Sequence, residues 1–249
     1  MALEPWRTGT VIRIEDETYN TRRFFIQVEE LDVFNFKPGQ FVTLDLPIHE
    51  KKNKRWRSYS IASWPDGTNV FELLIVLLED GAGTPYLFKD ISVGSVLTFR
   101  GPQGVFTLPE NIEKDLFFIC TGTGVAPFRS MLHYILLHNI PHQNMYLIFG
   151  CRTQKDLLYH EEMRSLEREL QDFTYMPTLS REGWGGYKGY VHSLYEEICK
   201  KNNEACEDIQ NLKPVSFYLC GWKAMIDDAR QKITALGYDR KSIHLELYG

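Results

Sequence analysis

The periodicity of this chain changes once, after Gly101-Pro102-Gln103-Gly104, and that change restricts the folds open to it. Before this point, short runs rich in β-branched and aromatic residues alternate with turn signals such as Lys37-Pro38-Gly39. The clearest runs cover residues 10–14, 23–28, 40–44 and 70–76. About six strands at this spacing predict a closed or nearly closed antiparallel β-barrel, interrupted by one short helix near residues 84–89.

From residue 115 onward, apolar strand-like runs alternate with segments of helical period. The expected strands cover residues 116–120, 145–149, 173–179, 215–220 and 243–247, and the expected helices cover 127–138, 155–170, 192–201 and 223–236. That alternation predicts a parallel sheet with helices on both faces, an α/β domain. A chain of 249 residues is long enough for two cores, so we expect a barrel domain at 1–110 and an α/β domain at 111–249.

The net charge and the distribution of apolar residues exclude some classes of function. A net charge of −5 argues against a nucleic-acid binder, which needs a basic face. No apolar run approaches the roughly 20 residues that span a bilayer, and the first residues lack a signal pattern, so a cytoplasmic protein is expected.

The five cysteines are odd in number and widely spaced, without a C-x-x-C pair. This pattern argues against a disulfide framework, a metal site or an iron–sulfur cluster. If the chain is an electron-transfer enzyme, its electrons must therefore leave to a separate partner.

A glycine-rich turn, Thr121-Gly122-Thr123-Gly124, directly follows the first strand of the second half. Glycines let the backbone approach a phosphate closely, and the following helix offers its N-terminal amides. Pro127 suits the first turn of that helix, although it stands where the full dinucleotide fingerprint has its third glycine. The pattern favours a nucleotide-binding turn over a plain tight turn.

A second polar segment follows the third strand of this half. Arg181 and Lys188 can pair with a ribose 2′-phosphate, Ser180 can hydrogen-bond to it, and an aromatic ring such as that of Tyr190 can stack on adenine. Ligands of open α/β sheets bind at this end of the strands. A solvated polar loop is the alternative.

Taken together, four motifs resemble the plant-type ferredoxin–NADP(+) reductases and their flavoprotein relatives over nearly the whole chain. They are Arg57-Ser58-Tyr59-Ser60-Ile61-Ala62-Ser63, the run from Gly122 to Ser130, Cys220-Gly221 with Met225, and the terminal Glu246-Leu247-Tyr248. The resemblance implies that the barrel binds FAD and that the α/β domain binds NADP(H).

The resemblance also implies roles for the barrel residues. Arg57 would neutralise the FAD pyrophosphate, Tyr59 would stack against the flavin, and Ser60 would hydrogen-bond near the flavin N5. The run Gly81-Ala82-Gly83-Thr84 resembles a second pyrophosphate cradle. Val76 stands where the plant enzymes have a lysine, so partner electrostatics are expected to differ.

At the other end of the chain, Cys220 and Glu246 resemble the pair that flanks the nicotinamide C4. Tyr248 resembles the terminal aromatic residue that covers the flavin and moves aside for nicotinamide. Gly249 extends one residue past it. Arg152 and Tyr159 lie where relatives contact the pyridine nucleotide.

These roles imply that hydride passes between NADPH and FAD and that single electrons pass to or from a ferredoxin or flavodoxin-like carrier. The basic run at 51–55 has three interpretations: a docking site for the carrier, a loop over the FAD adenosine, or a solvated turn. An NADH-dependent reductase of an oxygenase or cytochrome system is the main alternative, and a non-catalytic flavin sensor is a remote one. No His–carboxylate constellation suggests a general base, and His160 beside two glutamates predicts a solvated helix face.

Overall fold

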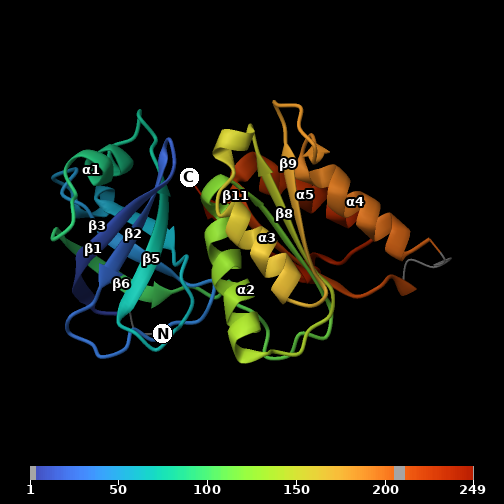
Figure 1. The fold of residues 1–249 in the computed structure, drawn as a ribbon, viewed down its shortest axis with the longest axis horizontal. Coiled ribbons are helices and arrows are strands. Elements are labelled where there is room, and N and C mark those ends of the chain that lie inside the picture. Colours follow the sequence, from blue (N-terminus) through green and yellow to red (C-terminus); the bar gives the residue numbers. More distant parts are fainter. Residues whose placement is uncertain (1–3, 205–210, 249) are drawn as a thin grey trace. The chain divides into compact units, whose positions relative to one another are not determined.

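The computed structural model describes residues 4–204 and 211–248, which form two compact units (Figure 1). One unit, here the barrel unit, comprises residues 1–108 and 126–137; the other, the sheet unit, comprises 109–125 and 138–249. Helix α2 (Ala126–His138) therefore groups with the barrel, although it follows the first strand of the sheet. The division at 110/111 expected from the sequence stays a prediction.

Six antiparallel strands and one short helix form the barrel unit (Figure 1). They are β1 (Trp6–Thr18), β2 (Thr21–Gln27), β3 (Phe41–Asp45), β4 (Trp56–Ser60), β5 (Val70–Val76), β6 (Val96–Gln103) and α1 (Gly83–Lys89). Their order is β4-β3-β6-β1-β2-β5, and a bridge between Ile61 and Leu73 joins the end of β4 to β5. The sheet thus closes, as predicted for the first half.

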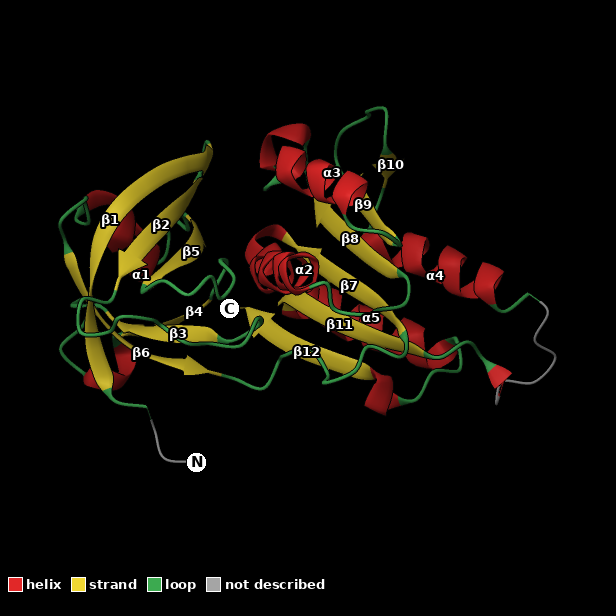
Figure 2. Ribbon diagram, turned by 60° about the horizontal axis from the view of Figure 1, so that its bottom comes forward, coloured by secondary structure: helices red, strands yellow, loops and turns green. Residues whose placement is uncertain are grey.

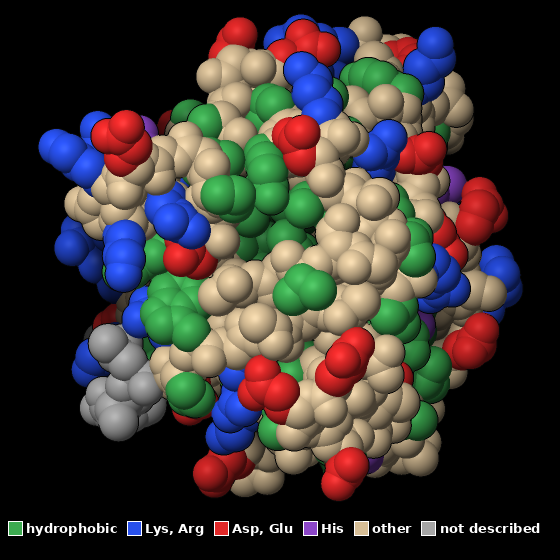
Figure 3. All heavy atoms as spheres, turned by 90° about the vertical axis from the view of Figure 1, so that its left-hand side faces the viewer, with side chains coloured by type: hydrophobic (Ala, Val, Ile, Leu, Met, Phe, Trp, Pro, Cys, Tyr) green, Lys and Arg blue, Asp and Glu red, His purple; other side chains and the backbone are tan. Residues whose placement is uncertain are grey.

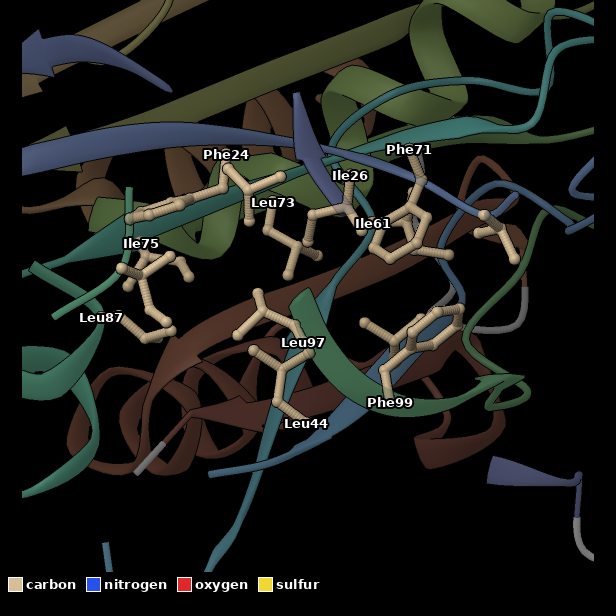
Figure 4. Packing of buried hydrophobic residues seen from close by; sticks show 14 of the residues in the cluster. Phe24, Ile26, Leu44, Ile61, Phe71, Leu73, Ile75, Leu87, Leu97 and Phe99 are labelled. Carbon is tan, nitrogen blue, oxygen red and sulfur yellow. The ribbon is translucent and has the colours of Figure 1, made fainter. Parts of the chain in front are cut away.

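Apolar side chains of these strands meet inside the barrel (Figure 4). Phe24, Phe71 and Phe99 come from three different strands and are fully buried. Leu87 of α1 belongs to the same cluster, so the short helix is tied to the barrel by its own apolar face. This packing holds the start of α1 beside the strands.

The sheet unit is built on a six-stranded parallel sheet in the order β10-β9-β8-β7-β11-β12 (Figure 2). Its strands are β7 (Asp115–Thr121), β8 (Met145–Cys151), β9 (Phe173–Leu179), β10 (Tyr187–Lys188), β11 (Val215–Trp222) and β12 (Ile243–Tyr248). Its helices are α3 (His160–Glu169), α4 (Val191–Asn202) and α5 (Lys223–Ala235). Because the strands are parallel, their carboxyl ends meet at one edge.

Helices cover both faces of this sheet, as the sequence predicts. Met176 packs in one core cluster with residues of α4 and α5. The neighbouring Tyr175 points to the opposite face, where Arg164 of α3 lies over its ring. No helix within the described residues is both long and apolar enough to cross a membrane.

The helix predicted over 155–170 is shorter than expected. A 3₁₀ turn (Gln154–Asp156) comes first, closed by reciprocal hydrogen bonds between Thr153 and Asp156. Tyr159 then takes a positive φ of 51°, and α3 begins only at His160. The helical periodicity of the sequence does not reveal this break, because the turn and the helix share similar residue types.

His160 corrects a second expectation. Its Nδ1 lies 3.3 Å from the Tyr175 hydroxyl, and the side chain is half-buried rather than on a solvated face. Burial lowers the pKa of this imidazole, with Glu161 opposing that shift. The ring therefore packs on the sheet as a neutral aromatic group.

Candidate functional site

The predicted pyrophosphate anchor lies where β4 meets the start of α1. The stem of Arg57 covers Gly83 so closely that a Cβ at this glycine would lie 3.1 Å from the arginine Cγ. Arg57 Nη1 also donates to the carbonyl oxygens of Lys54 at 3.1 Å and Trp56 at 2.8 Å. The guanidinium is therefore held in place by the chain itself, and its other donors remain available to an anion.

The predicted cradle, Gly81 to Thr84, is a closed loop. Thr84 Oγ1 accepts from the Leu78 amide at 2.9 Å and donates to the Leu78 carbonyl at 3.2 Å. The Gly81 amide donates to that same carbonyl. Thr84 thus fixes the loop, and a direct contact of its hydroxyl with a phosphate stays a prediction.

The other residues of this motif differ in exposure. Tyr59 is partly buried against the barrel core, and burial raises its pKa to about 12 while Arg57 acts in the opposite direction. Its phenol is therefore neutral at physiological pH. Ser60 is buried, whereas Ser58 is exposed and its Oγ lies 3.0 Å from Thr43 Oγ1.

One face of the barrel unit exposes hydrophobic side chains at its centre, with charged side chains of both signs around them (Figure 3). Large exposed apolar residues of this unit include Trp56 and Leu78. They adjoin Arg57 and the loop at Gly81 in sequence. Lys52 and Lys54, in the predicted basic run, are exposed in a 3₁₀ turn before β4.

In the sheet unit, the glycine turn packs directly on the end of β11. The turn is a 3₁₀ segment (Gly122–Val125), and a Cβ at Gly124 would collide with the backbone carbonyl of Cys220. Gly221 has a φ of 147°, and a Cβ there would lie 2.6 Å from Thr121 Oγ1. Only glycine fits these positions: the Gly124 backbone lies too close to the Cys220 carbonyl for a side chain, and Gly221 combines a positive φ with close contact to Thr121.

The Thr121 hydroxyl beside this turn is buried and has no hydrogen-bond partner among the described residues. A buried hydroxyl without a partner is unfavourable by roughly 1–3 kcal/mol. An incoming ligand group that bonds to it would remove this penalty. The orphaned hydroxyl therefore fits a polar ligand that occupies the turn.

Cys220, Glu246 and Tyr248 lie on the two adjacent strands at this edge. Cys220 is in register with Glu246 on one side and Cys120 on the other. The Tyr248 hydroxyl hydrogen-bonds the Cys220 thiol, and burial followed by the Glu246 charge raises the thiol pKa well above its usual value. The thiol is therefore neutral at physiological pH. Gly249 lies outside the described residues.

Of the predicted 2′-phosphate cations, Arg181 follows the end of β9 and Lys188 ends β10, while Arg152, predicted to contact the pyridine nucleotide, follows the end of β8. The Arg181 amide donates to the Arg152 carbonyl at 3.0 Å, and the Ser180 amide and Oγ both donate to Cys151. Within the described part of the chain, no carboxylate forms an ion pair with Arg152, Arg181 or Lys188. Three cations without acidic partners at one sheet edge suit a dianionic ligand.

The loop between Arg181 and Lys188 is organised by its own side chains. Glu182 accepts from the Gln154 amide at 2.7 Å and from its Nε2 at 3.2 Å. Trp184 Nε1 donates to the Tyr187 carbonyl at 2.6 Å. Tyr190 is 73% exposed, as stacking on a ligand requires, whereas Tyr159 is buried.

Two buried charged residues were not predicted from the sequence. Glu72 and Arg129 form an ion pair at 3.0 Å, with side chains only 3% and 5% exposed. A signal for Glu72 exists, because it is the one charged residue in the apolar run Val70-Phe71-Glu72-Leu73-Leu74-Ile75-Val76. Its partner lies 57 residues away, and the sequence does not reveal that contact.

Comparison with known families agrees with this architecture. Residues 8–108 match the model of the oxidoreductase FAD-binding domain, and residues 118–231 match the oxidoreductase NAD-binding domain. An FAD-binding barrel followed by a nicotinamide-nucleotide domain defines a flavoprotein oxidoreductase of the pyridine-nucleotide reductase class.

Comparison with individual proteins shows which members of this class the chain resembles. The chain is 35% identical to ferredoxin–NADP reductase B of Sorangium cellulosum over 222 residues, covering 86% of each chain. It is 33% identical to the electron transfer component of anthranilate 1,2-dioxygenase from Acinetobacter baylyi, covering 80% of this chain but 53% of that longer protein. A solved cytochrome P450 reductase from Amycolatopsis superposes with a TM-score of 0.82 at 25% identity, over 99% of this chain and 71% of its own.

The chain belongs to the ferredoxin–NADP(+) reductase family. It is an oxidoreductase that binds FAD and a nicotinamide nucleotide, as the sequence motifs predicted. Electron-carrier proteins are the partners that this family implies.

Proposed function

We propose that this chain is an FAD-dependent ferredoxin(flavodoxin)–NADP(+) reductase, exchanging hydride with NADPH and single electrons with a small carrier protein. The observation that carries the proposal is the edge of the parallel sheet. There the unsatisfied Thr121 hydroxyl, the Cys220–Tyr248 hydrogen bond and the unpaired Arg181 occupy the ends of parallel strands. Open α/β sheets bind nucleotides at this edge.

FAD fits the barrel residues. Arg57 and the backbone of Gly81, Ala82 and Gly83 would hold the pyrophosphate, because the Arg57 side chain already lies against Gly83. Ser58, Tyr59 and Ser60 would contact the flavin side of the cofactor. Bound FAD supplies the hydride-accepting ring and the ability to release electrons one at a time.

The sheet unit would hold the pyridine nucleotide. The amides of Gly122, Thr123 and Gly124 would bind its pyrophosphate, with Thr121 and Gly221 beside them. Ser180, Arg181 and Lys188 would bind the 2′-phosphate, Arg152 would add charge, and Tyr190 would stack on adenine. The neutral Cys220 thiol and the Glu246 carboxylate would flank the nicotinamide, and Tyr248 would cover the flavin until nicotinamide arrives.

The preference for NADPH over NADH rests on the charges at the sheet edge. A 2′-phosphate brings about two negative charges, and each charge-assisted hydrogen bond contributes roughly 1.5–3 kcal/mol. NADH offers only a hydroxyl at that position, so the unpaired cations favour NADPH. The name of the Sorangium relative agrees with this choice.

The partner would be a ferredoxin or flavodoxin-like carrier. The exposed basic turn containing Lys52 and Lys54 suits an acidic protein, since opposite charges accelerate docking. Free thiols at Cys120, Cys151, Cys199 and Cys220 fit a reducing compartment, and we place the protein in the cytoplasm.

A second candidate is the NADH-dependent reductase of an oxygenase, which the similarity to the anthranilate dioxygenase component favours. Anaerobic mixing with NADPH and, separately, NADH decides between them, with flavin absorbance as the readout. Rapid bleaching by NADPH with slow bleaching by NADH supports the proposal. Equal or faster bleaching by NADH transfers the assignment to the oxygenase class, and bleaching by neither nucleotide overturns both.

A further inference from the structure

Two tryptophans and one arginine form a cluster on the barrel unit, outside the FAD motifs. The ring centroids of Trp6 and Trp56 lie 5.7 Å apart. The Arg100 guanidinium lies over both rings, 5.0 Å from the Trp6 centroid and 5.3 Å from the Trp56 centroid. Each tryptophan is nevertheless 38% exposed. These three side chains, here the Trp–Arg cluster, therefore present a preassembled aromatic surface that carries one cation.

The register of the strands explains why these residues meet. Trp6 of β1 pairs with Arg100 of β6, and Arg100 pairs on its other side with Thr43 of β3. Thr43 pairs in turn with Ser58 of β4, whose side chain shares a face with that of Trp56 two residues earlier. The cluster thus spans four neighbouring strands on one face of the sheet.

The Trp–Arg cluster is separate from the proposed FAD site. Successive side chains of a strand point to opposite faces, so the side chains of Trp56 and Arg57 diverge. Arg57 packs on Gly83 at the start of α1, whereas Trp56 packs on Trp6 of β1. A cofactor held by Arg57 therefore leaves the cluster open to another ligand.

The cations of this surface lack acidic partners within residues 4–204 and 211–248. No carboxylate there forms an ion pair with Arg100, Lys52 or Lys54, whereas the neighbouring Arg55 pairs with Asp45 at 2.8 Å. Arg100 Nε is buried without a hydrogen-bond partner. Residues 50–57 carry five basic side chains against one acidic one. Unpaired cations beside exposed aromatic rings favour an acidic partner.

A protein surface fits the cluster better than a small molecule does. Small-molecule sites are concave, whereas Trp6 and Trp56 stand on the exposed face of a sheet. Tryptophan and arginine are the residues that contribute most to binding at the centre of protein interfaces. Charged residues at the rim mainly accelerate the encounter, and the exposed Lys52 and Lys54 suit that role.

We propose that the Trp–Arg cluster is the central contact of the docking surface for the acidic electron carrier, with Lys52 and Lys54 at its rim. The inference rests on the proposed function and assigns its protein partner to one face of the barrel. Trp56 lies three residues before Tyr59, about 10 Å along an extended strand. A carrier bound at the cluster is therefore close to the strand that we assign to the flavin.

The test compares Arg100→Gln with Arg13→Gln in the FAD-loaded protein. Arg13 is a matched control, because its guanidinium also lies over an aromatic ring, 3.6 Å from the Phe25 centroid, but pairs with Glu15. The probes are an acidic [2Fe–2S] ferredoxin and a flavodoxin, and ferricyanide is an acceptor that needs no docking surface. Each NADPH supplies two electrons and releases one proton, and two carriers take one electron each. Melting temperature and FAD content are measured alongside.

Arg100→Gln is expected to raise the KM for the carrier about tenfold, with the ferricyanide rate and FAD content within about twofold of the natural protein. Arg13→Gln should keep the KM for the carrier within about twofold. Equal KM values in the two variants, or a ferricyanide rate that falls as far as the carrier rate, would overturn the inference. Reduction of ferricyanide but of neither carrier by the natural protein would also overturn it.

Trp6→Leu covers the case in which Arg100→Gln does not fold. It removes one ring on β1, away from the FAD motifs, and should raise the KM for the carrier about fivefold. Tyr19→Leu is its control, because Tyr19 is 74% exposed and lies outside the cluster. An unchanged KM in Trp6→Leu contradicts the inference. A natural protein that passes no electrons from NADPH to ferricyanide refutes the proposed function instead.

Discussion

The candidate binding sites of the two units differ in how completely the chain satisfies its own polar groups. In the barrel unit, Arg57 bonds two carbonyls and packs on Gly83, and Thr84 is bonded twice to Leu78. In the sheet unit, the Thr121 hydroxyl is unsatisfied and Arg181 has no acidic partner within the described residues. The first arrangement is preorganised, whereas the second leaves donors open.

This difference corresponds to the two kinds of ligand. A preorganised site loses little conformational entropy on binding and so retains its ligand, as a resident cofactor requires. Open donors gain partners only while a ligand is present, which suits a nucleotide that enters and leaves in each cycle. We therefore assign FAD to the tight site and NADPH to the exchangeable one.

The largest expected effect comes from breaking the preorganised site of the barrel unit. Arg57→Leu removes the charge-assisted bonds to a diphosphate, and FAD affinity should fall roughly 100-fold. The ratio of flavin to protein absorbance after dialysis measures this loss. Arg13→Leu, which removes an exposed arginine paired with Glu15 on β1, should leave the ratio unchanged. Equal flavin retention in both variants contradicts the role of Arg57.

A second prediction concerns the glycine turn. Gly124→Ala places a methyl group against the Cys220 carbonyl, and this overpacking should lower the free energy of unfolding by about 2 kcal/mol and weaken NADP⁺ binding. Urea unfolding and nucleotide titration measure both changes. Gly185→Ala is the control, because a Cβ there meets nothing within 4 Å. Equal stability of the two variants would contradict this prediction, because it would mean that the glycine turn can move away from the Cys220 carbonyl at no cost.

In the sheet unit, Arg181→Gln should raise the KM for NADPH about tenfold and leave the KM for NADH unchanged, because only NADPH carries the 2′-phosphate. Steady-state rates with an artificial electron acceptor provide the measurement. Arg168→Gln, on the exposed part of α3, should change neither value. An equal rise in the KM values for NADPH and NADH would mean that Arg181 contacts a part of the nucleotide that both cofactors share.

The smallest expected effect concerns Cys220. Burial and the Glu246 charge raise the pKa of its thiol, so the group stays protonated at pH 8 and the reactive thiolate is absent. Iodoacetamide should leave the Cys220 peptide unmodified in the native protein and modify it after unfolding, as mass spectrometry can show. Rapid native modification at pH 8 would mean an exposed or activated thiol.

The sequence predicted the architecture because its signals are local. Strand periodicity, the glycine turn at Gly122 and Gly124, and the motif around Arg57 each lie within a few consecutive residues. The break before α3 escaped prediction because it depends on the positive φ of Tyr159. The Glu72–Arg129 pair escaped because it joins residues 57 positions apart. Long-range pairing of charges leaves no periodic trace in the chain.

Equilibrium dialysis of the purified protein, first without ligand and then against NADP⁺ and NAD⁺, tests the contrast between the two sites most directly. The account predicts about one FAD retained per chain, and reversible NADP⁺ binding at least tenfold tighter than NAD⁺ binding. Complete loss of FAD on dialysis, or equal affinity for the two nucleotides, would contradict it.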